Sequence, residues 1–171
     1  MPSTRQRVVA FCLLLIMTAG ASAAPAVKTA KKPVAAGNAT FYIYRTTGMI
    51  PNPFKPDIKI DGRTVAELSD GTYIVVTRPA GRHTIEVQPG GLTGGYTSEV
   101  SAAPGQSYFI AIAPLRQGAP GSDALAALFY GNAGATPMPG RSGFYAMYGL
   151  FSLDPQQGRA AIAKLKRVRA H

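Results

Sequence analysis

The chain lacks tryptophan, and among its 171 residues it has one cysteine and two histidines. The cysteine, Cys12, lies in an apolar run near the N-terminus and follows the bulky Phe11, which argues against a lipid-attachment signal. If that run is removed on export, no thiol remains for a disulfide, a thiolate metal site or a cysteine nucleophile. We therefore expect packing and hydrogen bonds to supply the stability of the folded part.

Apolar runs are also short, and none approaches the roughly 20 residues that span a bilayer. The longest, Val8 to Met17, follows two arginines and precedes the small residues Ala21-Ser22-Ala23. This order is typical of a secretory signal peptide over residues 1–23, cleaved near Ala23. We expect an exported protein, periplasmic or secreted in a bacterium, with no transmembrane segment after cleavage.

Acidic residues are scarce, since eight of them face 18 lysines and arginines for a formal net charge of +10. Residues 33–158 are nevertheless balanced, with eight basic and all eight acidic residues. The excess lies in the signal, in a predicted flexible basic tail over residues 24–37, and near the C-terminus. The C-terminal cations are Arg159, Lys164, Lys166, Arg167 and Arg169.

A neutral body with basic ends argues against nucleic acid as the partner of an exported protein. It fits weak contact with an anionic membrane surface or an acidic polymer, because each cation near such a surface gains only about 1 kcal/mol and salt screens it. The alternative is that these cations serve solubility and complement a helix dipole.

Short runs of β-forming residues separated by turn residues fill most of the body. Between Asp57 and Val87, the turns Asp61-Gly62, Asp70-Gly71 and Pro79-Ala80-Gly81 predict tight connections between successive strands. Strands are also predicted over residues 39–45, 96–102, 107–113 and 144–153. Turn signals about 8 to 12 residues apart predict an all-β fold, as a single domain over residues 38–171.

Two segments depart from this pattern. Residues 115–142 are rich in glycine and proline and predict a long insertion. After the last strand, Asp154 is expected to cap a helix that begins at Pro155. An amphipathic helix over residues 155–169 should then lie on the sandwich through one apolar stripe, formed by Ala161, Ile162, Leu165 and Val168.

The turn and core residues of the body resemble those of a bacterial family of exported domains of unknown function, DUF2846. The resemblance is carried by Ile60-Asp61-Gly62, Val65-Ala66-Glu67-Leu68, Gly71-Thr72-Tyr73 and the run from Pro79 to Ile85. It implies an envelope domain without an assigned activity. With the patterns above, we expect an immunoglobulin-like or transthyretin-like antiparallel β-sandwich of about seven or eight strands with a C-terminal amphipathic α-helix.

His83 is the histidine of the predicted body, and an enzyme built on it would need an acidic partner from the nearby turns. Glu86 lies three residues further along the same strand and should face the other way, which leaves Asp70 on a neighbouring strand. We favour a histidine bonded to a turn carbonyl. Asp57 and Asp61 lack the dense acidic spacing of a calcium loop, so we predict no catalytic residue, no metal site and no cofactor.

Aromatic side chains concentrate on both sides of the end of the insertion, at Phe129, Tyr130, Phe144, Tyr145 and Tyr148. In a strand, alternate side chains face away from the core. Either the insertion folds back over them, or they form an apolar patch that binds another envelope protein or polymer. We therefore predict a non-catalytic binding or structural module of the cell envelope. The alternatives are an enzyme of unfamiliar type centred on His83 and the acidic turns, or a peripheral membrane-associated protein.

Overall fold

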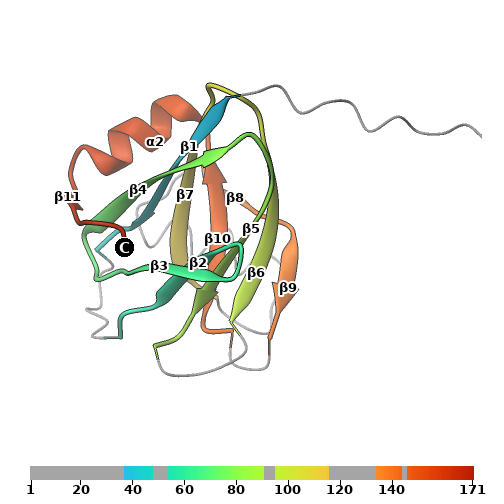
Figure 1. Ribbon diagram of the computed structural model, residues 1–171. Coiled ribbons are helices and arrows are strands. Elements are labelled where there is room, and N and C mark those ends of the chain that lie inside the picture. The colour runs from blue at the N-terminus through green and yellow to red at the C-terminus, as the bar shows by residue number, and fades with distance from the viewer. Residues whose placement is uncertain (1–36, 48–53, 91–94, 116–133, 144–145) are drawn as a thin grey trace, which may run out of the picture. The chain divides into compact units, whose positions relative to one another are not determined.

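Strands with alternating buried and exposed side chains build two facing sheets in the computed structural model (Figure 1). The structure describes residues 37–47, 54–90, 95–115, 134–143 and 146–171. The six-stranded sheet contains, in spatial order, β11 (Lys166–Arg167), β4 (Thr72–Pro79), β1 (Asn38–Arg45), β7 (Ser107–Pro114), β10 (Tyr148–Leu153) and β8 (Thr136–Pro137). The five-stranded sheet contains β3 (Arg63–Glu67), β2 (Asp57–Ile60), β5 (Gly81–Gln88), β6 (Tyr96–Ala102) and β9 (Gly140–Ser142).

The main core lies between the two sheets. Phe41 and Ile43 of β1 are fully buried, and so are Ile85 and Val87 of β5 in the other sheet. This is the period-two burial expected of strands with one face on a core. The all-β sandwich is confirmed, and the eight strands of four or more residues among the described residues match the expected number. The remaining three, β8, β9 and β11, have two or three residues each.

Of the predicted turns, Asp61-Gly62 closes the β2–β3 hairpin. The expectation of a hairpin at Pro79-Ala80-Gly81 is wrong, because this connection and Asp70-Gly71 each join strands of different sheets. At the β2–β3 turn, Asp61 has φ 53° and Gly62 has φ 77°, the left-handed pair that a two-residue turn needs to match the strand twist. Pairing is not antiparallel throughout, because β1 runs parallel to β7 and β11 runs parallel to β4. The six-stranded sheet is therefore mixed, whereas every strand pair of the five-stranded sheet is antiparallel.

A second apolar cluster covers the other face of the six-stranded sheet. It contains Tyr44, Phe109 and Phe151, against which Ala161 and Ile162 of helix α2 (Pro155–Ile162) pack. Gly158 makes this contact possible, because a β-carbon there would collide with the Phe109 ring. The helix therefore lies closer to β7 than any larger residue at position 158 would permit.

Helix α2 begins as predicted and ends earlier. The Asp154 carboxylate accepts hydrogen bonds from the Gln156 and Gln157 N–H groups, and Pro155 is the first helical residue. The expectation of a helix to residue 169 is wrong, since the helix ends at Ile162 and β11 follows. Strand β4 competes for the backbone there: the Lys166 N–H donates to the Gly71 carbonyl just before β4, and the Val168 N–H donates to the Tyr73 carbonyl within it. Within the ranges given above, no helix has the length and apolar character to cross a membrane.

Two short segments close the open sides of the sandwich. On one side, residues 136–142 pair with β10 through β8 and with β6 through β9, passing from one sheet to the other. On the other, β11 pairs with β4, and the His171 N–H donates to the Val65 carbonyl of β3 at 2.8 Å. The end of the predicted insertion therefore forms edge strands of both sheets.

Candidate functional site

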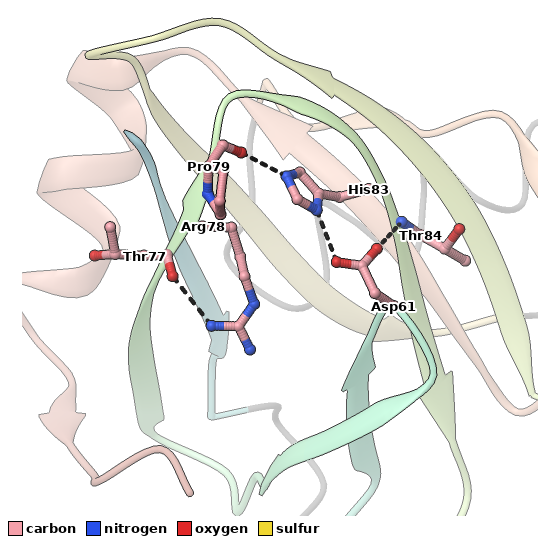
Figure 2. Close-up of polar contacts among 6 residues, drawn as sticks. All are labelled: Asp61, Thr77, Arg78, Pro79, His83 and Thr84. Carbon is pink, nitrogen blue, oxygen red and sulfur yellow. Dashed lines mark hydrogen bonds and ion pairs between the residues drawn. The ribbon is translucent and has the colours of Figure 1, made fainter. Parts of the chain in front are cut away.

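Three groups of residues are candidates for a site, and the first surrounds His83. This side chain lies near the start of β5, points towards the core and is 8% exposed. Its Nδ1 is 2.8 Å from Asp61 Oδ2, and its Nε2 is 2.7 Å from the Pro79 carbonyl oxygen (Figure 2). Asp61 Oδ1 accepts a hydrogen bond from the Thr84 N–H at 3.0 Å. The histidine thus joins the β4–β5 connection to the β2–β3 turn.

The surroundings of His83 favour its charged form. Burial alone would lower the pKa of His83, but the hydrogen bonds to Pro79 and Asp61, with the negative charge of Asp61, raise it above its ordinary value despite Arg78. Burial would likewise raise the pKa of Asp61, yet its bonds from His83 and Thr84 and nearby positive charge lower it. A carbonyl and a carboxylate only accept, so both contacts are hydrogen bonds in the form of the ring that carries a proton on each nitrogen.

A doubly protonated ring held by two acceptors has no lone pair with which to remove a proton from a substrate. The predicted turn carbonyl is found as Pro79. Neither acidic partner considered from the sequence is the one present, because Asp70 contacts Arg45 and Glu86 lies outside this contact. Sequence reasoning assigned Asp61 to its turn, weighed it as a calcium ligand and did not pair it with His83, although alignment of β2 with β5 places that turn beside Thr84.

The second group surrounds Arg45, a buried arginine at the end of β1. Its Nε is 2.7 Å from Asp70 Oδ1, and its Nη1 donates to the carbonyl oxygens of Phe54 and Leu68 at 2.5 and 3.2 Å. The guanidinium lies 5.2 Å from the centre of the Tyr148 ring. The side chain is 4% exposed. These contacts are inward-facing and tie β1 to the β3–β4 connection, so the group is structural.

Tyr148 does not belong to the predicted aromatic surface. Its side chain is 1% exposed and packs in the main core, so it cannot present its ring to a partner. Tyr148 is the first residue of β10, which pairs with β7, and it shares the core-facing side of this strand with Leu150. The other four predicted residues, Phe129, Tyr130, Phe144 and Tyr145, lie outside the described residues.

The third group is the basic segment, which we define as the five predicted cations Arg159, Lys164, Lys166, Arg167 and Arg169. All five are exposed. The ion pairs found within the described ranges join Arg45 to Asp70, Arg82 to Glu99 and His83 to Asp61, and so leave the basic segment out. Arg167 and Arg169 also line a shallow hollow of about 460 Å³ beside Val75.

A larger groove of about 550 Å³ lies where β6 ends and β7 begins, next to residues 136–139. Sequence reasoning missed it, because it depends on where edge strands stop. Its apolar lining includes Val100, Tyr108, Ile110, Met138 and Leu153. No cluster of three or more histidine, cysteine, aspartate or glutamate side chains suited to a metal occurs in the part of the chain that the structure describes.

Comparison with known proteins identifies a family. The model of the family described as protein of unknown function, DUF2846, matches residues 35–119. No curated protein and no solved structure matches the chain. The matched stretch contains β1 to β7, whereas residues 136–142, α2 and the basic segment lie beyond it.

Proposed function

The chain belongs to the DUF2846 family of proteins of unknown function, and we propose that it is an exported, non-catalytic binding module of the cell envelope. Its basic segment would make peripheral contact with an anionic component of that envelope, such as acidic lipid headgroups or an acidic polymer.

The observation that carries this proposal is the set of five exposed cations, none of which forms an ion pair with another described residue. Lys166 and Arg167 form β11 at the edge of the six-stranded sheet and Arg169 follows it, whereas Arg159 lies in α2 and Lys164 just after it. Residues 155–171 contain no aspartate or glutamate. Each cation near an anionic surface contributes about 1 kcal/mol, so several on one segment produce reversible binding that salt weakens.

A non-catalytic role is supported by the way His83 is held. The alternative was an enzyme centred on this residue and the acidic turns. Both ring nitrogens of His83 are occupied by acceptors, and Asp70 is engaged by Arg45. A general base would first have to lose these contacts, so the geometry favours binding over proton transfer at this position.

The test is cosedimentation with vesicles. We expect binding to vesicles that contain phosphatidylglycerol, little binding to phosphatidylcholine alone, and release by added salt or by a soluble polyphosphate. The double variant Arg167→Gln and Arg169→Gln should lose about 2 kcal/mol, which is roughly 30-fold in affinity. Its matched control is Lys55→Gln with Arg63→Gln, two exposed cations elsewhere on the body.

Equal weakening by both double variants would show that only net charge matters and would contradict the role of the basic segment. Binding that persists after a high-salt wash would contradict the electrostatic mechanism. If the vesicles fail and polyphosphate alone binds, the partner is an acidic polymer.

Export is tested separately by sequencing the N-terminus of the protein recovered from the periplasm or medium. We expect a new N-terminus near Ala24. Recovery of the intact chain in the cytoplasm would contradict the proposed location.

A further inference from the structure

We propose that the exposed end of β6 and the groove beside it bind an extended peptide segment of a partner protein, which adds to the five-stranded sheet as a further strand. This site lies on the side closed by residues 136–142, so it is separate from the basic segment. The proposal does not depend on the proposed function.

Strand β6 has a neighbour on one side along its whole length and on the other side along only part. It pairs with β5 from Tyr96 to Ala102, but with β9 only from Tyr96 to Ser98. Beyond that point the chain continues as Pro139, which has no N–H to donate to a ladder. The edge of β6 from Glu99 to Ala102 is therefore left without a strand partner within the described residues.

The direction of the free backbone groups follows from the alternation along β6. The Gly95 carbonyl accepts the Gly143 N–H on the β9 side. Alternate residues of a strand direct their N–H and C=O groups to the same neighbour, so Glu99 and Ser101 face this side too. The Ser101 carbonyl accepts the Tyr108 hydroxyl at 3.3 Å, so the template consists of the Glu99 N–H and C=O groups and the Ser101 N–H. Those groups form a short template on which another strand can pair.

The groove lies directly beside this edge and is suited to apolar side chains. Its volume of about 550 Å³ is within the range of roughly 300–1,000 Å³ typical of ligand pockets. A strand next to β6 would direct every second side chain into the space between the sheets. Polar groups at the rim come from Ser101, Gln106, Ser107, Thr136 and Ser152.

Charge complementarity narrows the class of peptide. Glu99 is the charged side chain that lines the groove. It is 61% exposed and contacts Arg82, which is 75% exposed, at 3.4 Å. Such an exposed pair contributes little, so a lysine or arginine of the ligand can compete for the carboxylate. The predicted ligand alternates apolar residues with basic ones.

The test uses the full ¹⁵N-labelled chain and a short capped peptide of alternating valine and lysine, with a valine–glutamate peptide as its matched control. We expect the first peptide to shift the amide signals of Glu99 and Ser101 and to slow their exchange with solvent. The second should do neither. Slowed exchange is the signature of strand addition, because simple filling of the groove leaves these N–H groups in water.

Two substitutions test the contacts, and a third serves as the control. Glu99→Lys should weaken the valine–lysine peptide by roughly fivefold, the worth of one exposed ion pair. Glu67→Lys, the same change on edge strand β3, should leave it unchanged. Ser101→Pro removes one edge N–H from a position that tolerates proline and should abolish slowed exchange, with thermal unfolding as the check on folding.

Three results would overturn the proposal. The first is no binding of the valine–lysine peptide, or binding of the valine–glutamate peptide at the same strength. The second is a shift of groove signals without slowed exchange at Glu99 and Ser101, which would indicate a pocket for apolar groups only. The third is equal weakening by Glu99→Lys and Glu67→Lys, which would indicate a general charge effect.

Discussion

An ion pair with at least one buried partner lies near each end of strand β1, and the two pairs differ in what keeps them charged. Near its start, where Asn38 pairs with Pro79, His83 contacts Asp61. At its end, Arg45 contacts Asp70. Arginine is charged at every ordinary pH, whereas histidine is charged only while its partners hold the proton. The first pair should therefore respond to pH and the second should not.

The depth of the two pairs differs as well. The Arg45 and Asp70 side chains are 4% and 20% exposed, whereas those of His83 and Asp61 are 10% and 44% exposed. Loss of one partner costs more when the other stays away from water. We therefore expect the loss of an ion-pair partner to cost more stability at the Arg45 end of β1 than at the His83 end.

The largest effect is expected for Arg45→Ala. The change removes the charge that faces Asp70 and two hydrogen bonds to carbonyl oxygens, and it opens space against Tyr148. The free energy of unfolding should fall by about 3 kcal/mol, as for other broken buried pairs. Urea unfolding measures it.

The control is Arg82→Ala, which breaks the exposed pair with Glu99. That change should cost less than about 1 kcal/mol. If the two variants lose equal stability, burial does not separate these ion pairs, and the comparison between the ends of β1 fails.

Much of this arrangement could be predicted from local patterns. The Asp61-Gly62 turn fixes where β2 ends and β3 begins, and alternating apolar residues place Phe41 and Ile43 on the core. The cap at Asp154 fixes the start of α2. Each of these depends on neighbours in the sequence, so a single sequence is enough.

Contacts between distant segments were not predictable in the same way. Glu86 and Asp70 were considered for His83 because of their types, but the partner is Asp61, 22 residues away and brought close by the register of β2 with β5. The helix was extended to residue 169 because its apolar stripe continues, although the edge of β4 pairs with β11 instead. Pairing between strands that are distant in the sequence therefore decided both outcomes.

A smaller effect is expected at the His83 end, in the pH dependence of stability. The folded pKa of His83 is raised, so its contribution is full below the unfolded value of about 6.5 and is lost as pH rises through the folded value. The folded pKa of Asp61 is lowered, so its contribution is full above about 3.9 and is lost as pH falls through the folded value. Thermal unfolding should show the pair at full strength between roughly pH 4 and 6.5.

Asp61→Asn isolates the pair, since asparagine also tolerates the positive φ of this turn. We expect it to cost about 1 kcal/mol or less near pH 6, given the exposure of Asp61, and to reduce the loss of stability above that pH. Arg45→Met is the comparison at the other end and should leave the slope unchanged. An unaltered slope in Asp61→Asn would show that other groups determine the pH dependence.

The smallest effect should have the opposite sign, at Tyr44 next to Arg45. Its hydroxyl is buried, and no donor or acceptor in the described part of the chain contacts it; burial raises its pKa. An unsatisfied buried hydroxyl is costly, so Tyr44→Phe should raise the free energy of unfolding by about 0.5 kcal/mol. In Tyr108→Phe, the hydroxyl bonded to the Ala103 N–H is lost, and stability should fall by about the same amount. If both variants lose stability, the Tyr44 hydroxyl has a hydrogen-bond partner in solution. The expected difference between a buried hydroxyl with a partner and one without would then be absent.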